Sequence, residues 1–428
     1  MPEASPTKFD AIVVGAGPAG STVAIQLARA GWSVALIERQ RFPRRKVCGE
    51  CIAASNLPLL EALGIGDAMD ALAGPALRQV TLMRANSAVT ADLPAAQHPA
   101  YPWGRALGRE TLDSLLLEQA RDAGAVVLQP WAVQAILGVA GAWHCEVRML
   151  DTSALRRFRA TVVIDAHGSW EDLPSDRPKR RQARSGADLF AFKANFLGSP
   201  LPEGQISVLA LDGGYGGMVI ADGLVATLAC CVRRDRLSEL RSAAPGQSAS
   251  DAIQSWLQRD CTGVRQALDG ARRDGPWLAS GPLSPGVRLE VQDGIFRVGN
   301  AAGEAHPILG EGMSMALQSA ALLCSHLLAV HGAGVPDAAV QARVLRAYEA
   351  AWRREFVPRL RLAAVFAHLA MRPRSAAVLM KLLQHWPGLL TQGARWGGKV
   401  RVAELTTATA HESTLPSRPA SARASPLL

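Results

Sequence analysis

Two glycine-rich segments carry the residue types whose spacing could do chemistry. The first reads GAGPAG, and its members are Gly15, Gly17, Pro18, Ala19 and Gly20. In this spacing the first glycine allows a tight turn, the second lets the backbone approach a pyrophosphate, and the third permits close packing of a helix on a strand. An acidic residue, Glu38, follows at a distance where its carboxylate can accept hydrogen bonds from a ribose. The set predicts a site for an adenine dinucleotide, and the acid disfavours NADP.

The elements that must position this turn are present in the right order. Phe9–Val14 is an apolar strand, Thr22–Ala30 has helical character, and Val34–Ile37 is a second apolar strand that leads into Glu38. The helix offers the N–H groups of its first turn and the positive end of its dipole to an anion. This βαβ unit does not by itself distinguish FAD from NAD.

The second segment runs VGNAAGEAHPILGEGM, from Val298 to Met313. Together with the first it closely resembles the FAD-dependent oxidoreductases with the para-hydroxybenzoate hydroxylase fold, a superfamily that includes geranylgeranyl reductases, aromatic hydroxylases and flavin-dependent halogenases. The resemblance implies that Asn300, in place of the family's aspartate, meets the ribityl and pyrophosphate part of FAD. It also implies that Gly310, Gly312 and Met313 lie at the isoalloxazine ring.

Further segments of the family pattern imply further FAD contacts. Gly104–Asp113 resembles the family's arginine-led helix start, so Arg109 is expected at the phosphate or ribose. Val133 is expected to pack on adenine, and Arg39 and Arg45 are expected to face FAD. His167 replaces an aspartate of the hydroxylases, which leaves the docking of NADH or NADPH open.

The segment Arg41–Cys51, RFPRRKVCGEC, is expected to pass near the flavin and the substrate. It resembles the geranylgeranyl reductase-like branch. Cys48 is either a reactive thiol or a small residue lining the pocket. His306 either donates to substrate or flavin, or packs as a neutral side chain. The expected catalytic residues are therefore Cys48 and His306, and the substrate-pocket candidates are Glu50, Tyr215 and Pro307.

The expected fold class is α/β: a Rossmann-like FAD-binding domain, an inserted antiparallel β-sheet substrate domain and a C-terminal helical region. Asp222-Gly223 marks a hairpin in the middle sheet, and 125–137 reads as one strand. The expected FAD-binding domain comprises 8–80, 100–178 and 285–335. The substrate domain comprises 81–99 and 183–284, the C-terminal helices 336–400, and a disordered tail 404–428. Leu173–Arg184 reads as a linker.

Composition limits the classes of function. The 428 residues are 49% hydrophobic and 19% charged, with a formal charge of +9 supplied mostly by arginine. The seven scattered cysteines are not a disulfide framework, no metal site is expected, and no nucleic-acid motif accompanies the charge. No stretch approaches a membrane span, and no targeting segment is visible, so a cytoplasmic location is expected. The basic helices of 351–390 either cap the substrate domain, with Pro358, Pro373 and Pro387 interrupting them, or rest on an anionic bilayer.

The function expected from the resemblance is that of an FAD-dependent oxidoreductase of secondary metabolism. The leading alternative is a monooxygenase that hydroxylates an aromatic, polyketide or lipidic small molecule, with NADH or NADPH as transient reductant. The second is a geranylgeranyl reductase-like enzyme that acts on C=C bonds. A halogenase is disfavoured because no lysine occurs between Lys46 and Lys179, the interval where that family carries one. A non-catalytic flavin-binding accessory protein and a flavin-free NAD dehydrogenase are the remaining alternatives, and the oligomeric state stays open.

Overall fold

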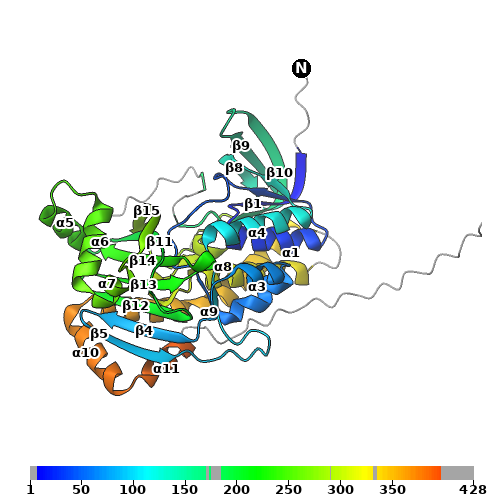
Figure 1. Ribbon diagram of the computed structural model, residues 1–428. Coiled ribbons are helices and arrows are strands. Elements are labelled where there is room, and N and C mark those ends of the chain that lie inside the picture. Colours follow the sequence, from blue (N-terminus) through cyan, green and yellow to red (C-terminus); the bar gives the residue numbers. More distant parts are fainter. Residues whose placement is uncertain (1–6, 170–172, 175–184, 290, 331–334, 397–428) are drawn as a thin grey trace, which may run out of the picture.

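The computed structural model describes residues 7–169, 173–174, 185–289, 291–330 and 335–396. Two lobes, each built on a β-sheet, lie side by side, and a row of C-terminal helices runs along both of them (Figure 1). The lobe drawn mostly in blue and cyan contains the glycine turn, and the green lobe contains the second sheet. The expected tail lies outside the described residues, and so does all but Leu173 and Pro174 of the expected linker.

The first lobe, here called the FAD lobe, is built on a sheet in which strands from distant parts of the chain run parallel. The strand order is β7-β2-β1-β10-β9-β8, and β17 also pairs with β10. The strands are β1 (Thr7–Val14), β2 (Val34–Ile37), β7 (Val126–Leu128), β8 (Trp131–Val139), β9 (Ala142–Met149), β10 (Leu155–Asp165) and β17 (Phe296–Arg297). The single strand expected over 125–137 is wrong: β7 and β8 are separate, and Pro130 between them has no N–H for a ladder.

Alternate side chains of this sheet enter two cores. Val13 and Leu36 face a core shared with the helices α1 (Pro18–Arg29), α4 (Arg109–Asp122) and α8 (Gly312–Ala329). Ile12 and Ile37 face the other core, with residues of β8 and β9. Because both faces are covered, β1 and β2 read as continuous apolar runs in the sequence.

Helix α8 corrects the expectation that no stretch approaches a membrane span. Its 18 residues have a mean hydropathy of 1.3, and by length and composition it is the one helix of the described residues that could cross a bilayer. However, 61% of it is buried, and it packs closely against α1. The apolar composition is therefore explained by its place in the core of the FAD lobe.

The second lobe, the substrate lobe, has a sheet with the strand order β15-β11-β14-β13-β12-β4-β5. Its strands are β4 (Gln79–Arg84), β5 (Ser87–Asp92), β11 (Leu189–Leu197), β12 (Gln205–Leu211), β13 (Gly214–Ile220), β14 (Ala226–Arg233) and β15 (Arg272–Leu283). The sheet is not wholly antiparallel as expected, because β4 pairs in parallel with β12. The expected hairpin at Asp222-Gly223 joins β13 to β14.

Helices that the sequence analysis did not identify cover one face of this sheet. They are α5 (Arg234–Ala243), α6 (Ala249–Asp260) and α7 (Thr262–Ala267), and Trp256 of α6 is fully buried against the strands. Near the junction of the lobes lie α2 (Leu57–Ala62), α3 (Gly66–Leu72) and two short ribbons. The ribbons are β3 (Cys51–Ile52) with β6 (Arg105–Ala106), and β16 (Gly286–Val287) with β18 (Gly303–Glu304).

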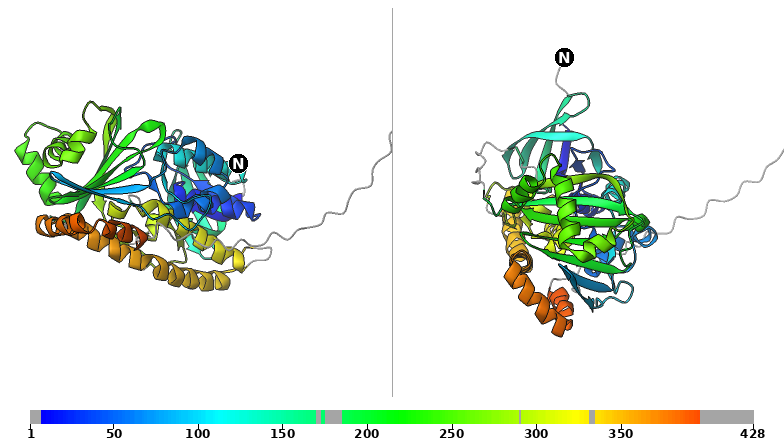
Figure 2. Two further views of the ribbon diagram at one scale, coloured as in Figure 1. Left: turned by 60° about the horizontal axis from the view of Figure 1, so that its bottom comes forward. Right: turned by 60° about the vertical axis from the view of Figure 1, so that its left-hand side comes forward.

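The C-terminal helices are α9 (Ala338–Ala370), α10 (Pro373–His385) and α11 (Gly388–Trp396). Figure 2 shows α9 running along both lobes. At the FAD lobe the Tyr348 hydroxyl donates to the Arg297 carbonyl over 2.7 Å, and further along the helix Ala367 packs on the substrate sheet. Pro358 lies inside α9 without ending it, so the expected interruption there is wrong, whereas Pro373 begins α10. The expected α/β fold class with a C-terminal helical region is confirmed.

Candidate functional site

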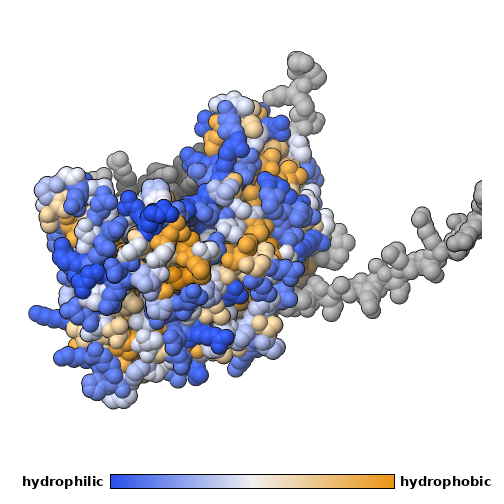
Figure 3. Space-filling model, in the orientation of Figure 1, coloured by the Kyte–Doolittle hydropathy of each residue, from blue (hydrophilic) through white to orange (hydrophobic). Residues whose placement is uncertain are grey.

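Two cavities meet where the lobes join. The larger, about 750 Å³, lies at the edge of the FAD lobe, and the smaller, about 240 Å³, lies between that lobe and the substrate sheet. Lys46 and Val47 line both cavities, so the two cavities adjoin at this loop. Figure 3 shows hydrophobic residues gathered in the middle of the face where the lobes meet.

The larger cavity is lined by the two residues predicted to meet the adenosine end of FAD, Glu38 and Val133, together with other candidate residues of the cofactor site. Its lining includes Gly15, Glu38, Arg39, Arg45, Val133 and His167. The Glu38 carboxylate is 4% exposed and accepts hydrogen bonds from the backbone N–H groups of Ala16, at 2.8 Å, and Gln40, at 2.7 Å. These bonds fix the carboxylate at the end of β2 and leave it lone pairs that a ribose hydroxyl could use.

The smaller cavity brings the two glycine-rich segments together. Gly17, Pro18 and Ala19 line it from one side, and Asn300, Gly310, Gly312 and Met313 line it from the other. Segments nearly 300 positions apart in the sequence therefore face a single space, as an extended dinucleotide requires. The Asn300 amide donates to the Ser169 hydroxyl over 2.6 Å, which holds this side chain at the rim.

The three glycines of the first segment are glycines for different physical reasons. A Cβ on Gly20 would lie 1.8 Å from the Gly15 carbonyl oxygen, and Gly15 itself has a φ of +100°. Both are therefore required by the packing of the turn itself. A Cβ on Gly17 would meet nothing nearer than Arg109 Nη2 at 3.7 Å. The space beside Gly17 is thus a cradle that a Cβ would partly fill and that a ligand can enter.

Two helices begin at this cavity with their first N–H groups uncapped by side chains. Helix α1 has Gly17 as its N-cap residue, and α8 has Glu311. The positive ends of both helix dipoles favour negative charge on a bound group.

Two cations complete an anion-binding site beside Gly17. Arg109 is buried and makes a two-pronged ion pair with Asp113, at 2.7 and 2.8 Å. Burial opposes its charge, but Asp113 raises the pKa of Arg109 above its ordinary value. Lys46 forms no hydrogen bond or ion pair within the described part of the chain, and burial, with Arg109 and Arg44 nearby, lowers its pKa to about 8. An unpaired, partly desolvated amine next to two helix N-termini fits a pyrophosphate.

Lys46 is the functional residue that the sequence analysis missed. The signal was available, because Lys46 stands within the quoted Arg41–Cys51 segment. The FAD contact was instead predicted for Arg45. Arg45 lines the larger cavity, but its donors are taken up by Glu110, at 2.9 Å, and by Asp274, at 2.5 and 2.6 Å. Its guanidinium therefore ties the loop to the start of β15 in the substrate lobe.

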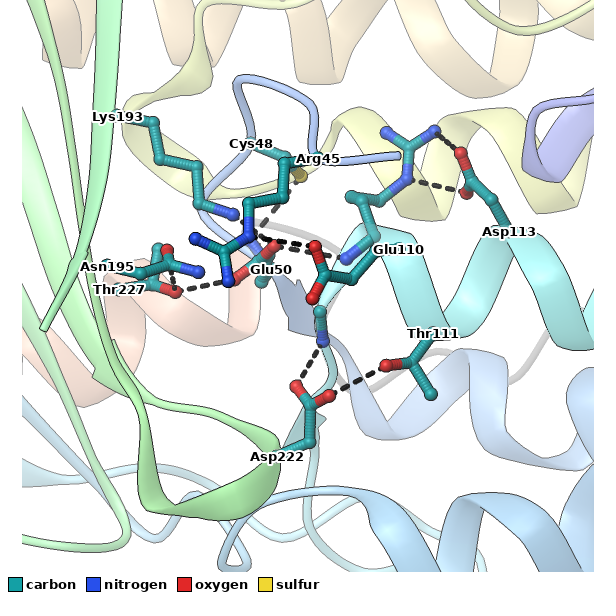
Figure 4. A network of polar contacts seen from close by, with 12 residues as sticks. Arg45, Cys48, Glu50, Glu110, Thr111, Asp113, Lys193, Asn195, Asp222 and Thr227 are labelled. Atoms are coloured by element: carbon teal, nitrogen blue, oxygen red, sulfur yellow. Dashed lines mark hydrogen bonds and ion pairs between the residues drawn. The ribbon is translucent and has the colours of Figure 1, made fainter. Parts of the chain in front are cut away.

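Glu50 joins the same loop to the substrate sheet through a buried network (Figure 4). Its carboxylate forms an ion pair with Lys193 of β11, accepts from the Thr227 hydroxyl of β14, and accepts from the backbone N–H of Arg109 at 3.0 Å. Glu50 is 3% exposed and Lys193 is 1% exposed. Glu50 lines the cavity as expected, but its oxygens are committed to these partners, so its role is to position the loop rather than to exchange protons with a substrate.

The substrate side of the cavity carries a phenol–imidazole pair. The Tyr215 hydroxyl lies 3.4 Å from His306 Nδ1, and Tyr215 and Pro307 line the cavity. Burial, followed by the nearby His368, lowers the pKa of His306 to about 4, so this imidazole is neutral at pH 7. Burial, and then the neighbouring Cys231 thiol, raises the pKa of Tyr215 well above its ordinary value. The pair is therefore uncharged at pH 7 and suited to hydrogen bonding rather than to ion pairing.

The remaining candidates have simpler surroundings. Cys48 lines the cavity and its sulfur accepts from the Glu50 N–H at 3.4 Å. Cys48 and Cys51 are both free thiols. Glu304, at the cavity wall, is paired with Arg288 at 2.5 Å. Among the residues that the structure describes, no cluster of side chains could hold a metal ion.

Comparisons with known proteins agree with this geometry. Residues 8–202 match the family model of an FAD binding domain. A tryptophan 2-halogenase of Chondromyces crocatus is 23% identical over 354 residues, which are 80% of this chain and 66% of that protein. A menaquinone reductase of Mycobacterium tuberculosis is 38% identical over 120 residues, 28% of each chain. The chain thus spans less than two thirds of the length of these relatives.

Two solved structures share the fold over nearly the whole chain. The myxobacterial chondrochloren halogenase, an FAD-dependent enzyme, has a TM-score of 0.72 at 20% identity and covers 92% of this chain and 96% of its own. A probable FAD-dependent monooxygenase of Pseudomonas aeruginosa has a TM-score of 0.63 at 18% identity, with 92% and 99% covered.

The chain therefore contains an FAD binding domain over residues 8–202, and it shares the fold of FAD-dependent halogenases and monooxygenases. Both findings agree with the resemblance stated from the sequence. The proteins similar to this chain include halogenases, a reductase and a probable monooxygenase, so the similarity alone does not decide the reaction.

Proposed function

We propose that the chain is an FAD-dependent monooxygenase that hydroxylates an electron-rich aromatic, polyketide or lipidic small molecule, with NADH or NADPH as the electron source. The observation that carries the proposal is the Tyr215–His306 pair set in an apolar wall. Ile206, Val208 and Met218 line the substrate side of the same cavity. Such a wall suits an apolar ring or chain, with one polar group that can address a hydroxyl.

The chain's own residues would position the cofactor and the substrate. When bound, FAD supplies the redox chemistry with oxygen. The neutral His306 can accept a hydrogen bond from the Tyr215 hydroxyl, and the Tyr215 oxygen can in turn accept one from a substrate hydroxyl, which would orient the substrate at the cavity wall. Lys46, Arg109 and the two helix N-termini hold the cofactor's negative charge.

The lysine pattern favours hydroxylation over halogenation. Lys46 is the one lysine among the described residues that line the smaller cavity, and it lies at the junction with the larger one, beside Arg109. The Lys193 amine is held by Glu50. Apart from Lys46, the described lining of the smaller cavity offers no amine for the role that the halogenase resemblance gives to a lysine.

A reductase is the second candidate, because the Cys-Gly-Glu loop resembles the geranylgeranyl reductase-like branch and the menaquinone reductase is 38% identical over the stretch it matches. In that reaction the pair would hold the substrate by the same hydrogen bonds.

The test uses the FAD-loaded protein, NADH or NADPH, isotopically labelled dioxygen, and a panel of alkyl phenols and menaquinones. A product that contains one labelled oxygen atom supports the monooxygenase. An unlabelled product that forms without air and has gained two hydrogens at a C=C bond contradicts it and supports the reductase. Tyr215→Phe and His306→Asn are expected to retain FAD and to lower product formation by about 10-fold, because each removes one hydrogen-bonding group from the pair.

A further inference from the structure

An apolar stripe lies exposed on the outer side of α10 and of the turn into α11. Val378 is 67% exposed, Trp386 is 61% exposed, and Leu382 and Leu389 are also exposed. Val378 and Leu382, four residues apart, lie on one side of α10. Trp386 at the C-cap of α10 and Leu389 at the start of α11 continue the run of exposed apolar residues along the chain. The opposite side of α10 is buried against the substrate sheet through Ala376, Met380 and Leu383. The helix therefore has one apolar face for the core and a second that faces water.

Positive charge surrounds this stripe. By helical spacing Arg374 and Lys381 lie on the same outer side of α10 as Val378, and both are exposed. Arg372 precedes the helix and Arg395 follows on α11, and both are exposed. The sequence has no aspartate or glutamate between Glu355 and Glu404.

We propose that this surface, named here the α10 face (Val378, Leu382, Trp386, Leu389, Arg374 and Lys381), docks on an anionic lipid bilayer. Aliphatic and indole side chains can enter the boundary between headgroups and acyl chains while arginine and lysine meet the anionic headgroups. The positive charge of the α10 face favours an anionic bilayer over the other possible partners. A second copy of the chain would bring the same positive surface, and a nucleic acid would leave the apolar stripe in water.

The α10 face lies beside a route to the cavity. Leu390 and Ala394 of α11 pack on a cluster with Leu77 and Leu93. Beside that cluster is a third cavity, of about 30 Å³. It shares the lining residues Cys51, Ile206 and Gly310 with the 240 Å³ cavity between the lobes. For the lipidic substrates within the proposed function, docking would bring the bilayer close to this route. Docking itself does not depend on that function.

The test is co-sedimentation of the full-length, FAD-loaded protein with vesicles of phosphatidylcholine, with and without phosphatidylglycerol. We expect binding to the vesicles that contain phosphatidylglycerol and weakening of that binding as salt is added. The double variant Arg374→Gln/Lys381→Gln should bind about 25-fold more weakly, because each basic residue near an anionic surface contributes about fivefold. Leu382→Gln/Trp386→Gln should lose at least about tenfold.

Matched controls keep the test independent of folding and of catalysis. Val139→Gln/Leu155→Gln removes equally exposed apolar side chains from the FAD lobe, and Arg241→Gln removes an exposed charge from α5. Both should bind as the wild type does, and every variant should keep its FAD absorbance and melting temperature. Equal binding by all variants, or no binding to phosphatidylglycerol, would overturn the proposal. Self-association in light scattering that the Leu382→Gln/Trp386→Gln variant abolishes would instead make a second copy the occupant.

Discussion

At the scale of single residues, Lys46 is the group whose state depends most directly on the cofactor. Its amine is unpaired in the described chain, and its pKa is lowered to about 8 by burial and by Arg109 and Arg44. A pyrophosphate beside it would raise that pKa, so FAD binding should be strongest below about pH 8 and should weaken as the pH rises through that value. Lys46→Met should weaken FAD binding by about 10- to 30-fold.

Fluorescence titration of the apoprotein with FAD at several pH values measures both effects. Lys8→Met, on an exposed position of β1, is the control and should titrate as the wild type does. An unchanged dissociation constant for Lys46→Met would place the pyrophosphate elsewhere.

His306 makes a separate prediction for stability in acid. Burial, and then His368, lowers its pKa to about 4, whereas an unfolded histidine has a pKa near 6.5. Between these values the unfolded chain binds more protons than the folded one, so His306 makes stability fall as the pH drops from about 6.5 to about 4. His306→Asn should remove this contribution, on the order of 1 kcal/mol between pH 7 and pH 5.

Urea unfolding at the two pH values, compared with His385→Asn at an exposed position, measures the contribution. The titratable groups in contact with His306 are Tyr215 and His368, so the prediction applies to His306 in the presence of these two side chains. If His306→Asn loses as much stability in acid as the wild type, the imidazole is not held neutral in the fold.

At the scale of elements, the loop before β3 is held by the buried Glu50–Lys193 pair. Lys193→Met would leave the Glu50 carboxylate buried with only the Thr227 hydroxyl and the Arg109 N–H. Removing one partner of a buried ion pair costs about 3–5 kcal/mol, so the variant should unfold at much lower urea concentration. The double variant Glu50→Gln/Lys193→Met should recover part of that loss. Full additivity of the two single changes would show that the pair is not coupled.

The elements that local pattern could predict are those whose residues alternate or recur regularly. The βαβ unit from Phe9 to Glu38 was predicted because buried parallel strands and a glycine turn leave a clear local pattern. The helices α5 to α7 were not, since α5 is short and mostly charged and buries only Leu240. The parallel pairing of β4 with β12 joins distant segments and has no local signal.

The residues of the candidate site likewise fall into those that the sequence could predict and those that it could not. Gly17, Asn300 and Arg109 were found because motif spacing marks them, and the structure places all three on one cavity. The partners of Glu50 were not found, because Lys193 and Thr227 lie on strands that only the tertiary fold brings to the loop. Likewise, Arg45 could not be told from its neighbour Lys46 until the fold placed Asp274 beside it.

At the scale of the whole molecule, the cofactor site belongs to both lobes. Leu278, Ala279 and Ser280 of β15 line the larger cavity together with β8, and Tyr215 lines the smaller one together with Gly17. The lobes are also joined directly, since Asp222 in the β13–β14 turn accepts from the Gly108 N–H at 2.6 Å and the Thr111 hydroxyl at 2.8 Å (Figure 4). Neither lobe therefore holds a complete site alone.

This shared site makes a prediction for thermal unfolding. Because FAD would contact residues of both lobes, it should stabilise them together, and calorimetry should show one transition that moves as a unit. With free FAD at 100 times its dissociation constant the gain is about 2.7 kcal/mol, which for a chain of this size is a rise of about 3 °C in melting temperature. Adenosine diphosphate, which can fill only the larger cavity's end of the site, is the matched control and should give a smaller shift. Two transitions, of which FAD moves only one, would show that the cofactor is held by the FAD lobe alone.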